Sequence, residues 1–161
     1  MTLTSVCTDH GRTVFLGDVE NLAYNSIKAS LTSEDVRRTS ASVWSIIGEF
    51  NPQEIIASSH HFAQWIWFSW GRNPRRLIGS GRNGADHKLL EVIYSENLYT
   101  RYDTVIFGSG DGIFAQPAAE LSKKGLKVIA IHGKGCLSNK LKLAVHESIE
   151  IKTHQTEKSI A

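Results

Sequence analysis

Asp103-Thr-Val-Ile-Phe-Gly-Ser-Gly-Asp-Gly-Ile-Phe-Ala-Gln-Pro117 is the stretch from which both the fold and a candidate site are inferred. Its apolar residues from Val105 to Phe107 predict a short buried strand, which glycine and polar residues end before a helical pattern begins. Open α/β folds bind their ligands at the carboxyl ends of parallel strands. We therefore predict that Asp111 is a site residue.

The same alternation of apolar runs and amphipathic stretches continues along the chain. Strands are predicted at 13–17, 53–58, 75–79, 105–107 and 127–132, with a further short strand at 148–151. Helices are predicted at 22–30, 33–50, 60–70, 85–99, 114–124 and 139–145, with Thr32 as an N-cap. This order indicates an α/β fold with a doubly wound, mainly parallel sheet of about five strands and helices on both faces.

Length and composition limit the class of protein. The 161 residues fit one domain, which we place at 13–152, between an N-terminal extension at 1–12 and a polar tail at 153–161. Cys7 and Cys136 provide neither a disulfide framework nor the spacing of a metal site. The sequence has no apolar run of transmembrane length and no secretory signal. We expect a cytoplasmic protein that has no membrane partner.

Basic residues are unevenly distributed although the net charge is only +2. One basic segment contains a single acid, Asp86, among Arg72, Arg75, Arg76, Arg82 and Lys88. A second, from Lys123 to Lys142, contains six lysines and no acid. Basic segments beside isolated acids suit a polyanion that is bound through a metal. The alternative is that they are solvated helix faces and loops.

Three aspartates are predicted at the same edge of the sheet. Asp18 ends the first strand, Asp86 opens the helix after the third, and Asp111 ends the fourth. Clustered carboxylates resist ionisation unless a cation neutralises them, and oxygen ligands suit Mg²⁺ or Mn²⁺. Such a metal can generate hydroxide for attack on a phosphodiester. Taken singly, each residue also suits a turn, an N-cap or a helix start.

Aromatic residues are concentrated between His60 and Trp70. Three of the four tryptophans, Trp65, Trp67 and Trp70, fall in six positions, which is more than one buried helix face needs. They are candidates for core, for a stacking platform for bases, or for a dimer surface. The segment from Trp65 to Trp70 is therefore the candidate surface for a homo-oligomer.

Four motifs, in this order and spacing, resemble the NYN domains of the PIN-like nuclease superfamily. They are Phe15-Leu-Gly-Asp-Val-Glu-Asn-Leu22, Gly84-Ala-Asp86, Phe107-Gly-Ser-Gly-Asp-Gly-Ile-Phe114, and Leu137-Ser-Asn-Lys-Leu141 with the segment up to Ile149. The resemblance covers residues 13 to about 151. It implies a PIN-like, Rossmann-type three-layer fold and metal-dependent hydrolysis of RNA.

The resemblance also implies roles for individual residues. Asp18, Asp86 and Asp111 would be the catalytic metal ligands, and Asn21 and Ser109 would orient ligands or bind phosphate. Glu20 falls at a position that varies among relatives. Basic side chains predicted to contact the RNA backbone are Arg82, Lys88 and Lys134.

The sequence departs from the family pattern at two places. Ile113 stands where many relatives have a second acid, and His146 and Glu147 stand near the position of another. A single-metal site is therefore expected, unless Glu147 or Glu91 contributes a ligand.

Three functions are consistent with these residues. The leading hypothesis is an endoribonuclease that uses Mg²⁺ or Mn²⁺ and a metal-activated water. The alternatives are a catalytically silent RNA-binding or regulatory module on the same fold, and a Rossmann-like domain that binds a nucleotide or phosphate. A dinucleotide site is poorly supported, because residues 108–112 lack the spacing G-x-G-x-x-G.

Overall fold

The computed structural model describes residues 10–23 and 31–152, except the side chains of Trp65 and Trp67. Six parallel strands form one sheet in the spatial order β3-β2-β1-β4-β5-β6. The predicted fold class is confirmed, and the further short strand predicted at 148–151 is the sixth strand of the sheet. The strands are β1 (Thr13–Asp18), β2 (Gln53–Ser59), β3 (Arg75–Gly79), β4 (Thr104–Gly108), β5 (Lys127–His132) and β6 (Glu147–Glu150).

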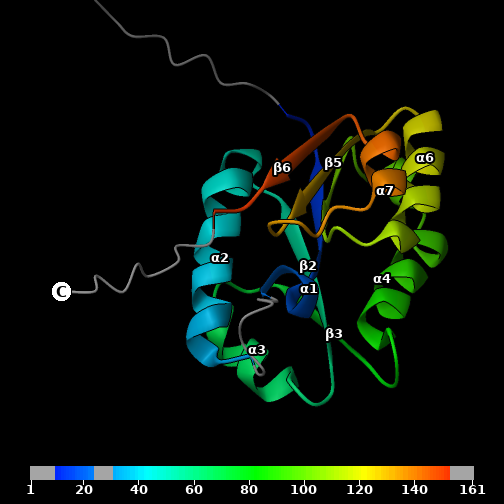
Figure 1. The fold of residues 1–161 in the computed structure, drawn as a ribbon. Helices are drawn as coiled ribbons and strands as arrows, with labels where there is room; N and C mark the ends of the chain where they lie inside the picture. The colour runs from blue at the N-terminus through cyan, green and yellow to red at the C-terminus, as the bar shows by residue number, and fades with distance from the viewer. Residues whose placement is uncertain (1–9, 24–30, 153–161) are drawn as a thin grey trace, which may run out of the picture.

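Helices cover both faces of this sheet (Figure 1). One face carries α2 (Ser33–Ile47) and α3 (Ala63–Ser69), and the other carries α4 (Gly84–Ser95), α6 (Ala115–Lys123) and α7 (Asn139–Ala144). The shorter elements are α1 (Val19–Ala23), α5 (Leu98–Arg101) and the 3₁₀ turns η1 (Gly48–Phe50) and η2 (Gly112–Phe114).

The central strand β1 supplies both hydrophobic cores. Val14 and Leu16 belong to the core under α4 and α6, whereas Phe15 belongs to the core under α2 and α3. Every residue of β1 and of β4 is buried. A strand covered on both faces reads as a continuous apolar run, which is why these segments lack the alternation of a half-exposed strand. Each such aliphatic side chain contributes about 1.5–3 kcal/mol when fully buried.

Local signals set most of the helix boundaries. Thr32 is the N-cap of α2, since its Oγ1 accepts from the Asp35 N–H at 3.2 Å while the Asp35 carboxylate accepts from the Thr32 N–H at 3.0 Å. This capping box confirms the predicted start. Gly125, at φ +93°, follows the end of α6 as predicted.

The predicted helix over 85–99 is divided into two. Asn97 adopts a left-handed conformation with φ 48°, which ends α4 before a four-residue α5 begins. Asparagine tolerates this conformation better than most residues, and the change of direction places Leu98 in the core. The predicted helix over 22–30 starts earlier, at Val19, and its residues 24–30 lie outside the described part of the chain.

The topology creates one switch point. From β1 the chain builds β2 and β3 to one side, and then crosses over to build β4, β5 and β6 on the other. The connections that leave the carboxyl ends of β1 and β4 therefore diverge, and this divergence opens a crevice in doubly wound folds. Asp18 and residues 109–111 lie at this point.

Candidate metal centre

The three predicted aspartates converge at the carboxyl edge of the sheet. Asp18 is the last residue of β1, Asp86 lies in the first turn of α4, and Asp111 is the N-cap of the turn η2 that follows β4. The carboxyl groups of Asp18 and Asp86 lie within hydrogen-bonding reach of each other. The charge of Asp111 acts on Asp86. The three aspartates thus belong to the same edge of the sheet although Asp18 and Asp111 are 93 positions apart in the sequence.

Asn21 joins the two strands of the switch point. Its backbone N–H donates to Asp18 Oδ1 at 3.1 Å, and its side-chain Oδ1 accepts from the Gly110 N–H at 3.2 Å. The predicted orienting role of Asn21 is consistent with these contacts, because they hold the loop after β4 against the start of α1. Gly110 has no room for a side chain, since a Cβ there would lie 2.0 Å from the Cys136 carbonyl oxygen.

Ser109 and Asp111 are ordered by local hydrogen bonds. The buried Ser109 accepts at Oγ from the Asp111 N–H at 3.2 Å, and Asp111 Oδ1 accepts from the Ile113 N–H at 3.0 Å. One carboxylate oxygen of Asp111 therefore caps η2. Its other oxygen, Oδ2, accepts from no donor among the described residues.

Burial and mutual repulsion shape the titration of this cluster. Burial raises the pKa of Asp18 well above its ordinary value, and the neighbouring Asp86 and Glu20 raise it further. Burial also raises the pKa of Asp86, and the charges of Asp111 and Glu20 add to this shift, whereas the hydrogen bond with Asp18 and the charge of His87 oppose it. Because like charges resist joint ionisation, Asp18 and Asp86 are hard to ionise together in the absence of a cation.

Carboxylate oxygens are the donors that a hard divalent cation prefers. Asp86 Oδ1 is buried and has no hydrogen-bond donor in the described part of the chain. A buried acceptor that lacks a partner costs free energy unless a proton or a cation satisfies it. The carboxylates are not preassembled around an ion, because residues 10–23 and 31–152 contain no group of three or more His, Cys, Asp or Glu side chains spaced to hold one. A bound cation would neutralise the carboxylates and draw their oxygens together.

Glu20 is the acid that sequence reasoning did not assign. Its Oε1 accepts from the backbone N–H of Ser59 at 2.5 Å, which ties α1 to the carboxyl end of β2. Its charge raises the pKa of both Asp18 and Asp86. The available signal was its position inside the first motif, two residues after Asp18.

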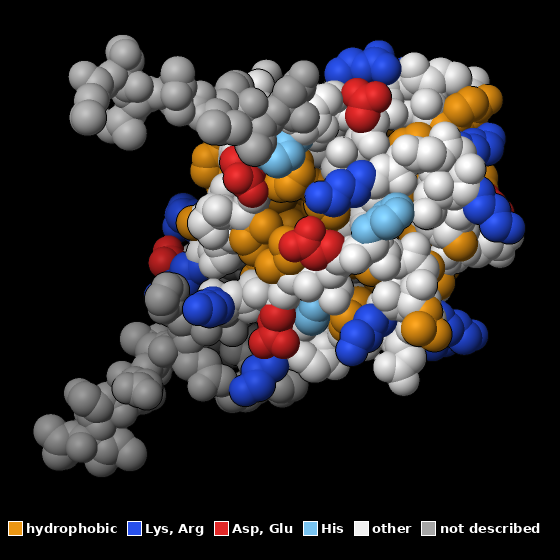
Figure 2. All heavy atoms as spheres, turned by 90° about the horizontal axis from the view of Figure 1, so that it is seen from above, with side chains coloured by type: hydrophobic (Ala, Val, Ile, Leu, Met, Phe, Trp, Pro, Cys, Tyr) orange, Lys and Arg blue, Asp and Glu red, His pale blue; other side chains and the backbone are white. Residues whose placement is uncertain are grey.

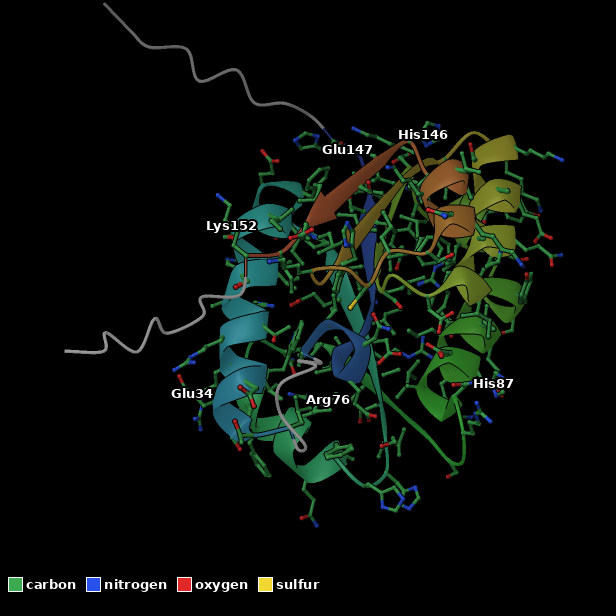
Figure 3. The ribbon with its side chains drawn as sticks, viewed as in Figure 1. Glu34, Arg76, His87, His146, Glu147 and Lys152 are labelled. Atoms are coloured by element: carbon green, nitrogen blue, oxygen red, sulfur yellow. The ribbon has the colours of Figure 1, made fainter. Side chains whose placement is uncertain are left out.

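The other acids considered for a second metal lie elsewhere. Glu91 is exposed and pairs with Lys88 at 3.0 Å. Glu147 pairs with Ile129 in the sheet, three strands from β1, which corresponds to roughly 14 Å. His146 and Glu147 lie at the end of the molecule opposite His87 (Figure 3). His146 is bound there, where its Nδ1 accepts from the Val128 N–H at 3.0 Å.

Two of the three basic side chains predicted to contact RNA are exposed at the edge of the sheet that carries the acids. Arg82 and Lys134 are exposed on loops at the same edge as the acids, after β3 and β5. Lys88 is half-buried and held by Glu91. Arg72 and Arg75, which contributed to the basic segment, are paired instead with Glu54 and Glu96, both at 2.7 Å.

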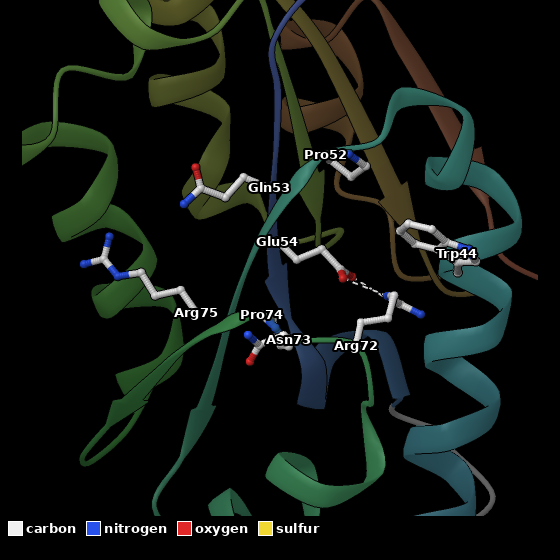
Figure 4. A pocket seen from close by; sticks show the side chains of 8 residues that line it. All are labelled: Trp44, Pro52, Gln53, Glu54, Arg72, Asn73, Pro74 and Arg75. Carbon is white, nitrogen blue, oxygen red and sulfur yellow. Dashed lines mark hydrogen bonds and ion pairs between the residues drawn. The ribbon is translucent and has the colours of Figure 1, made fainter.

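Two clefts lie at the opposite end of the sheet. One, of about 490 Å³, is formed at the starts of β2 and β3 around the Glu54–Arg72 ion pair (Figure 4). The other, of about 620 Å³, lies at the start of β1 and includes Phe50 and Tyr102. Figure 2 shows the amino-end face, where acidic and basic side chains alternate around apolar ones. Neither cleft contains an acid of the proposed metal centre.

The aromatic segment contributes to the core through Trp70. This side chain is 2% exposed and donates from Nε1 to Glu54 Oε1 at 3.2 Å, whereas Phe68 is 87% exposed. The side chains of Trp65 and Trp67, on which the predicted oligomer surface depends, lie outside the described structure. No helix within residues 10–23 and 31–152 is long and apolar enough to cross a membrane.

Comparisons with known proteins support the fold alone. No protein-family model matches the sequence. No curated protein matches it either. The structure is similar to the crystal structure of a protein of unknown function from Vibrio parahaemolyticus, with a TM-score of 0.59 and 16% sequence identity, over 90% of this chain and 96% of that one. The chain therefore shares a three-layer α/β fold with a solved structure whose function is not known.

Proposed function

We propose that this protein is an endoribonuclease of the NYN type that depends on Mg²⁺ or Mn²⁺. The observation that carries the proposal is the convergence of Asp18, Asp86 and Asp111 at the switch point, with a buried Asp86 oxygen that has no donor. The order of the sequence motifs supports the same assignment. Exposed Arg82 and Lys134 lie at this edge, where an RNA backbone would pass.

The residues at the carboxyl edge of the sheet would have different roles in metal binding. Asp18, Asp86 and Asp111 would hold the cation, and Asn21 would fix the position of the Asp18 carboxylate through its N–H. A bound cation would favour the ionised forms of Asp18 and Asp86, whose pKa values burial raises. A bound divalent cation would supply hydroxide at neutral pH and would stabilise negative charge on the phosphate. Ser109 would keep the loop that carries Asp111 in place.

The test is cleavage of single-stranded and structured RNA in Mg²⁺ or Mn²⁺ by the wild type, Asp111→Asn and Asp103→Asn. The two aspartates lie at opposite ends of β4, and Asp103 pairs with Arg12 rather than with the acid cluster. We expect Asp111→Asn to lower the cleavage rate about a hundredfold, because loss of even an outer-shell partner of a metal ligand costs 10–100-fold and Asp111 is proposed as a direct ligand. Asp103→Asn should retain it. Equal cleavage by all three proteins would refute the mechanism.

A catalytically silent RNA-binding module is the second candidate. Ile113 favours it, because this half-buried side chain contacts the core where relatives carry an acid. This candidate predicts RNA binding that persists in EDTA and in Asp111→Asn, with no metal-dependent cleavage in either protein.

A further inference from the structure

The connection between β3 and α4 has a glycine spacing that sequence reasoning overlooked. Gly79-Ser-Gly-Arg-Asn-Gly84 follows a strand, opens a helix and reads G-x-G-x-x-G. In phosphate-binding turns, this spacing permits a tight reversal and a close approach of the backbone to the anion.

The two outer glycines hold the turn closed. A Cβ on Gly79 would lie 2.0 Å from the Gly84 carbonyl oxygen, and a Cβ on Gly84 would lie 2.7 Å from the Gly79 carbonyl carbon. Gly81 adopts φ +76° and accepts at its carbonyl from the Gly84 N–H at 3.2 Å. The start of α4 is thereby pressed against the end of β3, with Arg82 exposed in the loop.

The first turn of α4 contains donors without acceptors. Asn83, the N-cap, has φ 57° and its side chain makes no capping hydrogen bond. No acceptor among the described residues receives the N–H of Ala85 or of Asp86. The first N–H groups of a helix have no partner within the helix, and they suit an anion.

The same turn also contains an acceptor without a donor. Asp86 is 5% exposed, and its Oδ1 has no partner in the described part of the chain. Free N–H groups require an anion, whereas a free carboxylate oxygen requires a cation. A phosphate that is bound together with a divalent cation satisfies both, which neither ion does alone.

We propose that Gly79–Gly84 and the first turn of α4 form a phosphate-binding site beside the metal centre. The N–H groups of Ala85 and Asp86 bind the phosphate oxygens, and the Arg82 guanidinium adds a charge contact. The assignment of RNA as the source of this phosphate rests on the proposed nuclease function. A dinucleotide fits poorly, since among the described strands none lies beyond β3 to support its second half.

The decisive variant is Asn83→Asp, with Asn97→Asp as its matched control. Both asparagines are exposed, have left-handed backbones and are N-caps without a side-chain cap, but they lie at opposite ends of α4. The new carboxylate at 83 occupies the anion site and repels a phosphate. Binding of a fluorescein-labelled short oligouridylate is measured by anisotropy in Ca²⁺, with unlabelled UMP and uridine as competitors.

We expect Asn83→Asp to raise the Kd for the oligouridylate about tenfold, and Asn97→Asp to change it by less than about twofold. Competition by UMP but not uridine indicates that a mononucleotide phosphate suffices, whereas competition by unlabelled oligouridylate alone indicates a phosphodiester. Equal Kd values for the two variants, effective competition by uridine, or a wild type that binds no probe would overturn the proposal.

Arg82→Gln provides a second measure that does not depend on a new acid. Loss of one phosphate contact on a single strand lowers the slope of log K against log salt by about 0.7. Arg12→Gln, at the other end of the sheet, should leave that slope unchanged, and an unchanged slope in Arg82→Gln would contradict the assigned contact. RNA binding without cleavage would refute the nuclease function but not the phosphate-binding site. Cleavage together with equal Kd values for Asn83→Asp and Asn97→Asp would refute the phosphate-binding site but not the nuclease function.

Discussion

The two ends of the sheet differ in whether their acidic side chains form ion pairs. At the amino end, Glu54 is bound by Arg72 at 2.7 Å, and Glu96 by both Arg75 at 2.7 Å and Arg101 at 3.2 Å. At the carboxyl end, Asp18, Asp86, Asp111 and Glu20 have no ion pair with a described Lys or Arg side chain. Burial instead raises the pKa of Asp18 and of Asp86, and neighbouring acidic charges add to both shifts.

This difference separates acids that stabilise the fold from acids that oppose it. Glu54 accepts from Arg72 through both oxygens and from Trp70, so that its charge is neutralised inside the protein. Asp18 and Asp86 are buried as deeply without such a partner. Unneutralised carboxylates are retained at the end of the sheet where open α/β folds bind ligands, which is the expected place for a cation.

The largest expected effect on stability comes from replacing one buried acid at each end of the sheet by its amide. Glu54→Gln leaves Arg72 without its partner and should lower the free energy of unfolding by about 3 kcal/mol. Asp86→Asn should raise it at neutral pH in EDTA, because the change removes a buried charge that has no cation. Urea unfolding monitored by tryptophan fluorescence measures both. A destabilising Asp86→Asn would show that the carboxylate is already satisfied.

Addition of Mn²⁺ should stabilise only proteins with an intact carboxyl-end cluster. At a free concentration one hundred times Kd, binding to the folded state adds about 2.7 kcal/mol. We expect this gain in wild type and in Asp103→Asn, and its loss in Asp86→Asn. Thermal denaturation with and without Mn²⁺ measures the difference. An equal gain in all three proteins would place the ion elsewhere.

Without metal, stability should fall as pH rises above the ordinary pKa of aspartate. Because the pKa values of Asp18 and Asp86 are raised in the folded state, that state holds more protons than the unfolded chain in this range. The slope is at most about 1.4 kcal/mol per pH unit for each proton held in excess. Asp86→Asn should flatten it. Parallel pH profiles for wild type and variant would contradict a raised pKa at Asp86.

The smallest effect is expected at an exposed pair of the amino end. Arg12 and Asp103 lie 3.7 Å apart with both side chains more than half exposed. Surface pairs of this kind contribute about 0–1 kcal/mol, so Arg12→Gln should change stability by no more than that. Urea midpoints in low and high salt measure the change. A larger, salt-sensitive loss would mean that the amino end also depends on individual charges.

The sequence predicted the parts of this structure that local signals determine. Strands 75–79 and 127–132 were located with the observed bounds, and Thr32 was identified as an N-cap, because apolar runs and capping residues act over a few positions. The three aspartates were assigned to one edge because parallel strands share their carboxyl ends.

The remaining features depend on contacts between distant segments. Arg72 donates to Glu54, which lies 18 positions away in the sequence. This pairing means that Arg72 does not contribute to a basic surface. Glu20 accepts from the N–H of Ser59, which is 39 positions away in the sequence. The break between α4 and α5 at Asn97 also depends on packing, since it places Leu98 in the core. The pattern of apolar residues in the sequence does not indicate this break.

A crystal soaked in Mn²⁺ tests the central claim most directly, since anomalous scattering locates the ion. The account predicts a peak at the carboxyl end of β1 and β4, within direct or water-bridged reach of Asp18, Asp86 and Asp111, with direct metal–oxygen distances of about 2.0–2.2 Å. A peak at the Glu96 or Asp103 end of the sheet, or no peak at a Mn²⁺ concentration that supports RNA cleavage, would contradict it.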